Sequence, residues 1–331
     1  MADYKGIQGF GVETLASDPT ESGSVGQIFY NSTSGTFKVV KPGGIAAGTW
    51  ASGDNLNTAR EQIGNAGASV TNALAFGGRT AGEVTNTESY NGTSWTEVND
   101  LNTERRLIDG IGTTNTAALA VAGYYTPGYQ SLVESWNGTS WTETTDTNSV
   151  HGAGGSAGTQ TAGLVFAGAP GDTPQGLTES WNGSTWTELG DLNDPRRNLG
   201  SCGTTNTAAL AIGGDTPGST ANTEQWNGTS WTEVNNLNTA RMELQGAGTS
   251  TSGLAFGGNV PPQTGITEYW DGTSWTEVAD LATARGQLGG AGISSTSSIA
   301  FGGNTAPFPA NSSATEEFIA PDVVINTLTT S

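Results

Sequence analysis

The segment NGTSWTE occupies residues 91–97, and the same seven letters recur at 137–143 and 227–233. Close copies stand at 182–188 (NGSTWTE) and 271–277 (DGTSWTE). An earlier tryptophan, in GTWASGDNLNTAR, keeps the same spacing of 44 to 46 residues, so that the series is Trp50, Trp95, Trp141, Trp186, Trp231 and Trp275. A fixed period of this length is typical of repeat architectures and decides the fold.

Three further marks keep the same spacing. A short apolar stretch ends in small residues, as in LAFGG at 74–78 and LAIGG at 210–214. A glutamate two residues before an aromatic residue follows each stretch, at Glu88, Glu134, Glu179, Glu224, Glu268 and Glu316. An arginine closes the loop after the tryptophan, at Arg60, Arg105, Arg196, Arg241 and Arg285, while His151 takes the third of these positions. The marks predict six structural units.

Each unit is predicted to contain four short strands. In the fifth unit these are residues 243–250, 252–258, 266–270 and 274–280. Asn-Gly or Asp-Gly lies between the last two strands, and this dipeptide favours a two-residue type I′ turn because both central residues of that turn need positive φ. The tryptophan and the aromatic residue of the preceding strand are expected to bury large surfaces against the neighbouring unit.

A unit of this size cannot cover both of its faces alone, and six such units arranged radially form a β-propeller. We therefore predict an all-β fold with an N-terminal hairpin arm at 1–45, a six-bladed propeller at 46–320 and a C-terminal tail at 321–331. The last unit has no tryptophan strand of its own, so residues 49–53 are expected to complete it. A seven-bladed alternative would add residues 27–40 and the segment VVINTLTT.

The composition excludes several functions. The net charge is −20, from 31 acidic and 11 basic residues, which disfavours a nucleic-acid partner. The chain has one cysteine, Cys202, and one histidine, His151, so we expect no Cys/His zinc site, no Ser–His catalysis and no cofactor. The first residues do not read as a signal peptide, and no run is apolar enough to predict insertion into a membrane.

The order of the marks, apolar-Gly-Gly, then Glu-x-aromatic, then Trp after a tight turn, resembles the kelch repeat. The resemblance covers residues 46–320, with Ala-Gly in place of Gly-Gly in the second and third units. It implies a scaffold that mostly binds partners, without implying any particular ligand.

A second resemblance is to the virion proteins of phages. The stretch GSVGQIFYNSTSGTFKVVKPGG, at 23–44, is similar to short hairpin modules near the start of phage tail and other virion structural proteins. The Thr/Asn/Gly-rich repeats after it are similar to kelch-like proteins of environmental phages. This resemblance implies that the N-terminal arm docks the chain on other virion proteins.

The residues copied into every unit are interpreted as structural. A guanidinium group can bridge loops through its fork of donors, and a carboxylate can accept backbone N–H groups. The alternative is an arginine ring that binds a carboxylate, as in six-bladed sialidases. His151 is interpreted as a tolerated substitution rather than a pH-responsive or catalytic group. The Asn-Gly-Thr and Asn-Gly-Ser triplets are interpreted as turns rather than glycosylation sites.

Recognition is expected where the copies differ. The loops between the second and third strands vary, as do the residues after the repeated arginine, and both sets of loops share one face of a propeller. The candidate binding residues are Tyr124, Tyr125, Tyr129, Arg106, Arg197, Met242 and Phe308. Exposed tyrosine rings suit stacking on sugars or anchoring of proteins.

The sequence thus favours a non-enzymatic virion protein whose variable face binds a host-surface glycan or protein, or a neighbouring virion subunit, within an oligomeric assembly. One alternative is a cytoplasmic kelch-like interaction module. Another is a glycan hydrolase, for which Asp109 and Glu243 are the acids nearest to the required positions.

Overall fold

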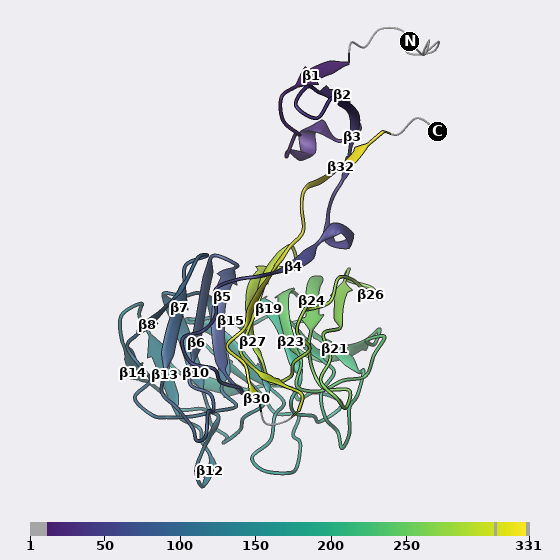
Figure 1. Ribbon diagram of the computed structural model, residues 1–331. Helices are drawn as coiled ribbons and strands as arrows, with labels where there is room; N and C mark the ends of the chain where they lie inside the picture. Colours follow the sequence, from purple (N-terminus) through teal and green to yellow (C-terminus); the bar gives the residue numbers. More distant parts are fainter. Residues whose placement is uncertain (1–11, 308–309, 329–331) are drawn as a thin grey trace. The chain divides into compact units, whose positions relative to one another are not determined.

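The computed structural model describes residues 12–307 and 310–328, and these contain many strands and no α-helix (Figure 1). Two single-turn 3₁₀ helices, η1 (Ser22–Ser24) and η2 (Ile45–Ala47), complete the secondary structure. The all-β prediction is therefore confirmed. The chain divides into a small unit, residues 12–48 and 320–328, and a large unit, residues 49–319.

The large unit contains six four-stranded antiparallel sheets, whose strands run in order from the innermost to the outermost. The first three are β5 (Gly64–Ser69), β6 (Asn72–Phe76), β7 (Thr87–Tyr90) and β8 (Trp95–Val98); β9 (Asp109–Thr114), β10 (Ala117–Val121), β13 (Val133–Trp136) and β14 (Trp141–Glu143); and β15 (Gly155–Thr159), β16 (Ala162–Phe166), β17 (Thr178–Trp181) and β18 (Trp186–Glu188). The others are β19 (Gly200–Thr205), β20 (Ala208–Ile212), β21 (Thr223–Trp226) and β22 (Trp231–Val234); β23 (Gln245–Thr249), β24 (Ser252–Phe256), β25 (Thr267–Trp270) and β26 (Trp275–Glu277); and β27 (Gly289–Ser294), β28 (Ser297–Phe301), β31 (Thr315–Ile319) and β4 (Thr49–Ser52). Two short hairpins lie in loops, β11 (Tyr124–Tyr125) with β12 (Gly128–Tyr129), and β29 (Asn304–Thr305) with β30 (Ala310–Asn311).

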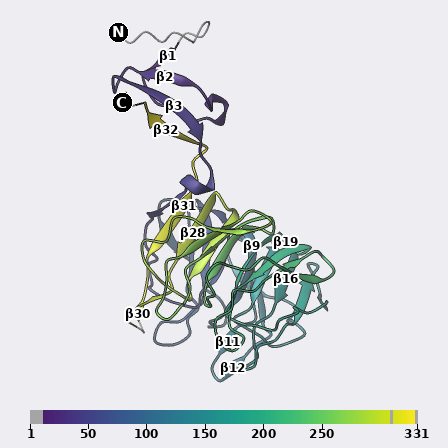
Figure 2. The ribbon, with the colours of Figure 1, turned by 90° about the vertical axis from the view of Figure 1, so that its right-hand side faces the viewer.

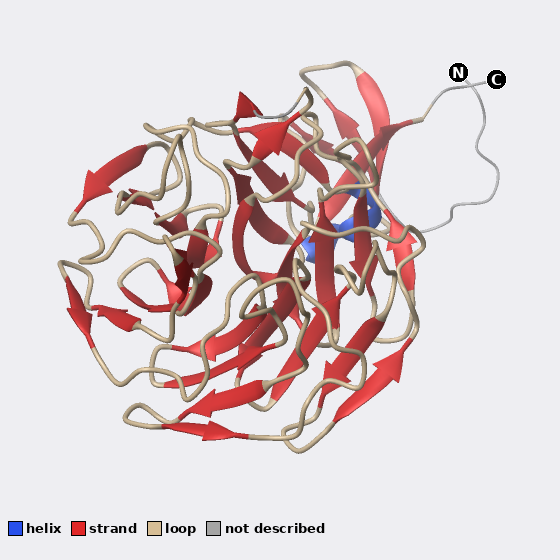
Figure 3. Ribbon diagram, turned by 90° about the horizontal axis from the view of Figure 1, so that it is seen from below, coloured by secondary structure: helices blue, strands red, loops and turns tan. Residues whose placement is uncertain are grey.

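The six innermost strands contact one another in chain order, and β27 also contacts β5. Seen from below, the sheets of the large unit lie around a common centre (Figure 3). The arrangement is compatible with a propeller-like fold. The outermost strand of the sixth sheet comes from the other end of the large unit, because β4 pairs antiparallel with β31, with Trp50 opposite Phe318. Residues 49–52 therefore occupy the place that the sequence predicted for them.

The repeated tryptophan packs on the preceding sheet. The ring of Trp95 lies 4.9 Å from that of Phe301, and that of Trp141 lies 4.9 Å from that of Phe76. The Trp95 indole N–H also donates to the Thr315 hydroxyl at 3.0 Å. Trp50 and Trp231 likewise pack on phenylalanines, whereas Trp186 and Trp275 lie in clusters with aliphatic residues of the neighbouring sheet. Burial against the neighbouring unit is the role that the sequence predicted.

The Asn-Gly turn differs from the prediction. Tyr90 pairs directly with Trp95, so the loop has four residues, and only Gly92 has positive φ, at 93°. The Asn91 side-chain oxygen accepts hydrogen bonds from the backbone N–H groups of Thr93 and Ser94, at 2.9 and 3.0 Å. The type I′ prediction was wrong because the asparagine side chain closes the turn, whereas its backbone stays at negative φ. Asp271 does the same in the fifth unit, which explains why DGTSWTE is an equivalent phrase.

The small unit is one four-stranded sheet built from both ends of the described chain (Figure 2). Its strands are β1 (Glu13–Leu15), β2 (Ile28–Asn31), β3 (Thr36–Pro42) and β32 (Val323–Thr327), in that order across the sheet. The predicted hairpin at 28–40 is present as β2 and β3. The C-terminal segment, whose partner the sequence did not identify, pairs with β3, with Ile325 opposite Val40. The strands required for a seventh blade thus form a sheet of their own.

Removal of β32 should loosen the small unit. Phe29 and Val40 are its buried apolar residues, and β32 pairs along Lys38–Pro42 of β3. Without β32 the hairpin of β2 and β3 keeps only the three-residue strand β1 as a neighbour, and a hairpin alone is marginally stable in water. We expect a chain ending at Ile319 to expose Lys38, which pairs with Asp18 at 2.7 Å. Acetylation with mass spectrometry would measure this, with the exposed Lys41 as the internal control. Unchanged acetylation of Lys38 would contradict the prediction.

Candidate functional site

The repeated arginines and glutamates form buried ion pairs inside the loops of the large unit. All five arginines are completely buried, and the six glutamates are at most 3% exposed. The pairs are Arg60–Glu88, Arg105–Glu134, Arg196–Glu224, Arg241–Glu268 and Arg285–Glu316. Burial lowers the pKa of Arg285 to about 10, although Glu316 opposes the shift.

Each pair ties the loop that enters a sheet to the third strand of that sheet. Glu88 accepts hydrogen bonds from the backbone N–H and the side chain of Asn57, at 2.7 and 2.9 Å, and Arg60 donates to the Ala75 carbonyl. The guanidinium and carboxylate groups therefore satisfy backbone groups that the short loops cannot pair among themselves.

The third unit departs from this arrangement. Glu179 accepts three hydrogen bonds from Asn148 and Ser149, at 2.8 to 3.0 Å, and no cation lies within ion-pair distance of it among the residues that the structure describes. His151 is 5% exposed and points to the previous sheet, where its Nε2 lies 3.4 Å from Oδ2 of the equally buried Asp109. Gly154 makes room for this pair, because a Cβ there would lie 3.0 Å from the same oxygen.

A closed ring of backbone hydrogen bonds links the six units just before their innermost strands. Each N–H donates to the carbonyl of the equivalent residue in the preceding unit, and the first donates to the last, at 2.7 to 3.1 Å. All six residues have φ between 52° and 59° although none is glycine. They are Gln62, Leu107, Ala153, Asn198, Glu243 and Gln287.

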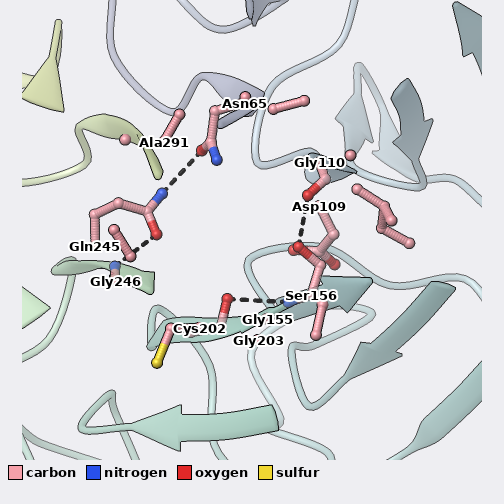
Figure 4. Close-up of a pocket in the computed structure, with 18 of the residues that line it drawn as sticks. Asn65, Asp109, Gly110, Gly155, Ser156, Cys202, Gly203, Gln245, Gly246 and Ala291 are labelled. Carbon is pink, nitrogen blue, oxygen red and sulfur yellow. Dashed lines mark hydrogen bonds between the residues drawn. The ribbon is translucent and has the colours of Figure 1, made fainter. Parts of the chain in front are cut away.

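The space between the innermost strands is narrow and partly filled by polar side chains (Figure 4). A cavity of about 120 Å³ remains there. The Gln245 amide donates to the Asn65 side chain at 2.8 Å, and the Ser156 hydroxyl donates to the Gly110 carbonyl at 2.7 Å. A Cβ on Gly110 would lie 2.1 Å from the Asn65 carbonyl oxygen, so the strands approach too closely there for any other residue.

The two acids considered for hydrolysis, Asp109 and Glu243, line one cavity at this ring. Burial raises the pKa of both carboxyl groups, while His151 opposes the shift at Asp109, and Gln287 and Asn259 oppose it at Glu243. The Glu243 carboxylate accepts hydrogen bonds from Gln287 at 2.8 Å and from Asn259 at 3.2 Å. Both acids therefore already have partners within the protein.

The variable loops are joined by backbone pairing. The residue after the repeated arginine pairs with a residue of the following variable loop, as in Arg106 with Tyr124, Arg197 with Asp215, and Met242 with Asn259. The loops that the sequence placed on one face therefore lie together.

Five of the candidate binding residues gather around β11 and β12. The rings of Tyr124 and Tyr129 lie 5.2 Å apart, and the guanidinium carbon of Arg106 lies 4.6 Å from the centre of the Tyr124 ring. Arg197 lies beside the same group, because its Nη1 donates to the Gly171 carbonyl at 2.9 Å, in the loop whose Ala169 N–H donates to the Gly152 carbonyl at 3.0 Å. Tyr125 is on the same hairpin and 38% exposed. Met242 lies in the fifth unit, and Phe308 lies outside the described residues.

Sequence reasoning missed the ring residues and the pairing of Asp109 with His151. The ring is made by backbone groups, and its six positions share a spacing but no residue type. The amino-acid sequence therefore gives no signal for it. The Asp109–His151–Gly154 group was detectable as three departures from the repeat within 46 residues.

No protein-family model matches the chain, and no curated protein matches it. Within the described residues, no helix is long and apolar enough to cross a membrane, and no three metal-ligating side chains gather at one point.

Loss of one buried arginine should destabilise the large unit strongly. We expect Arg241→Ala to lower the free energy of unfolding by about 3–5 kcal/mol, because it leaves Glu268 buried without a cation. Urea unfolding followed by tryptophan fluorescence would measure this. The control is Arg79→Ala, since Arg79 is 39% exposed and lies 3.8 Å from Glu61, and we expect a change below about 1 kcal/mol. Equal effects of the two substitutions would contradict a structural role for the buried series.

Stability should fall as the pH rises above 6.5. Burial alone would lower the pKa of His151, but the adjacent Asp109 carboxylate outweighs it and leaves that pKa above its ordinary value of 6.5. The folded state then binds more protons than the unfolded state, and the stabilisation is lost as the pH passes through the folded pKa. Urea unfolding from pH 6 to 9 should show this decline for the native chain and a smaller one for His151→Gln. Parallel curves would show that His151 does not titrate with folding.

Proposed function

We propose that the large unit is a six-bladed kelch-like β-propeller, closed by β4 as the outer strand of the last blade. Three observations support this: the six equivalent sheets, the contact of β27 with β5, and the hydrogen-bonded ring that runs through all six units. The kelch assignment itself is supported by the spacing of the Gly-Gly, Glu-x-aromatic and Trp marks.

We propose further that the protein is a non-enzymatic recognition scaffold. The observation that carries this is the separation of repeated and unrepeated residues. The repeated Arg, Glu and Trp residues are buried or hold loops together, whereas Arg106, Arg197 and three tyrosines break the repeat and meet on the loop face. A rigid framework with differing loops is a common arrangement for binding.

The setting that we propose is a phage virion, with the small unit docking on other virion proteins and the loop face binding a host-surface glycan or protein. The resemblance of residues 23–44 to virion hairpin modules supports this. The charge distribution supports it as well. Residues 49–319 contain 26 acidic residues and eight arginines, a net charge of −18, whereas the rest of the chain contains five acidic residues and three lysines, a net charge of −2. A nearly neutral unit can approach acidic neighbours more easily than the large unit can.

We expect the native chain to migrate with a particle of megadalton size. Size exclusion of material from the natural source, followed by mass spectrometry of each fraction, would measure this. Treatment of the particle fraction with a mild denaturant should release the chain at its own mass, which controls for accidental co-elution. Elution of the untreated chain at 33.7 kDa would contradict the virion proposal and favour the cellular interaction module.

A further inference from the structure

The departures from the repeat are concentrated in three consecutive units. The second and fourth units have a second arginine after the repeated one, Arg106 and Arg197, and the third unit between them has His151 and Gly152 instead. The Tyr129 ring packs against Gly152, where a Cβ would lie 3.1 Å from its Cδ1. Gly152 thus leaves room for the Tyr129 ring, and its carbonyl accepts a hydrogen bond from Ala169, in the loop that Arg197 contacts at Gly171. We call Arg106, Arg197, Tyr124, Tyr125 and Tyr129 the Tyr–Arg cluster.

The arginines of the Tyr–Arg cluster differ from the structural ones in their access to solvent. The side chains of Arg106 and Arg197 are 21% and 24% exposed, whereas the five repeated arginines are completely buried. The Arg106 Nη1 donates to the Gln62 side chain at 3.0 Å, and the Arg197 Nη1 donates to the Gly171 carbonyl at 2.9 Å. A guanidinium group has five N–H donors, so each arginine retains donors for a ligand.

The charges at the Tyr–Arg cluster are already balanced. The Arg106 Nε lies 3.2 Å from a Glu83 oxygen, and the Arg197 Nε lies 3.3 Å from an Asp215 oxygen. The fully exposed Asp172 adds a third carboxylate, 3.8 Å from Arg197. Two positive charges thus face three negative ones, within a unit of net charge −18. An acidic ligand would find no excess of positive charge at this place.

The remaining groups match the two kinds of surface of a sugar. Burial raises the pKa of Tyr129 against the opposing charges of Arg197 and Arg106, so its hydroxyl stays protonated and can donate and accept hydrogen bonds. Guanidinium donors beside carboxylate acceptors suit neighbouring sugar hydroxyls, each of which both donates and accepts. An exposed tyrosine face suits the apolar C–H face of a sugar ring.

We propose that the Tyr–Arg cluster binds a neutral sugar residue of a glycan. The C–H face of the sugar packs on the exposed Tyr125 or on Tyr129. Its hydroxyls bond to the Arg106–Glu83 pair on one side and to the Arg197–Asp215 pair on the other. This inference rests on the proposed recognition function and specifies its ligand class: neutral rather than sialylated or otherwise acidic saccharides.

The test uses the full chain and a panel of probes, namely lactose, maltose, mannobiose and N,N′-diacetylchitobiose, with 3′-sialyllactose as the acidic counterpart of lactose. Saturation-transfer NMR and titration calorimetry would detect binding. We expect at least one neutral probe to bind with a Kd of roughly 1 mM or tighter. We also expect 3′-sialyllactose to bind no better than lactose. Absence of binding by all neutral probes, or a preference for 3′-sialyllactose, would overturn the inference.

Substitutions locate the site. Tyr129→Ala and Arg197→Gln should each weaken binding by about tenfold or more. Tyr125→Ala removes only an exposed side chain, so it tests the cluster without endangering the fold. The matched control is Val260→Ala, an exposed residue of the corresponding loop in the fifth unit, which should bind as the native chain does. Undiminished binding by both Tyr125→Ala and Tyr129→Ala, with native urea midpoints, would place the sugar elsewhere and overturn the inference.

The outcome can be separated from that of the proposed function. Adsorption of the protein to host cells that no neutral saccharide inhibits would leave the recognition function intact, with a protein receptor, and would overturn the sugar site. Sugar binding by a chain that does not migrate with particles would preserve the site and reject the virion setting.

Discussion

Each four-stranded sheet of the large unit has two apolar faces, and only a neighbour on each side can cover both of them. The tryptophan of the outer strand meets this requirement in one direction, as Trp141 does on Phe76. The apolar residues of the second strand meet it in the other direction, since Leu119 and Val121 are completely or almost completely buried. A linear row would leave one face uncovered on its first sheet and one on its last sheet. Here the innermost strand of the last sheet, β27, contacts that of the first, β5.

Close packing of the sheets leaves short loops with many unpaired backbone groups, and the buried ion pairs resolve this. A glutamate on the third strand accepts the loop N–H groups, and the arginine beside it returns donors to the carbonyls of the second strand. The buried pair therefore fixes the backbone of the loops, whereas the exposed residues of the same loops can vary. Substitutions in these loops need not disturb the residues that hold them, so the recognition that we propose and the stability of the fold depend on different residues.

The repeat made the strands predictable, because six copies of one pattern reinforce each other and every strand carries a clear mark. The turn was less predictable, since an asparagine can serve a turn through its backbone or through its side chain, and Asn91 uses the side chain. The pairing of β32 with β3 was out of reach, because the partners are about 285 residues apart and neither belongs to the repeat. The candidate site was foreseen as single residues, but its convergence depends on the order of the units in space. The role of Gly152 could not be predicted, because it depends on the Tyr129 ring that packs against it in the structure.

The segment that precedes the first full sheet of the large unit pairs with the C-terminal segment in both units: β3 with β32 in the small unit, and β4 with β31 in the large unit. In the segments that flank the large unit in the sequence, the backbone N–H groups of Gly43 and Gly44 donate to the carbonyls of Asp322 and Pro321. Next to them, β3 pairs with β32. Within the large unit the same two segments continue as β4 and β31. The pairing in the small unit holds β4 at a high effective concentration beside the sheet that it completes, because the intervening segments are short. A sheet whose strands are far apart in the sequence, as β4 and β31 are, would otherwise bear a large loop-closure cost. The small sheet can therefore stabilise the large unit without any requirement for contact between them.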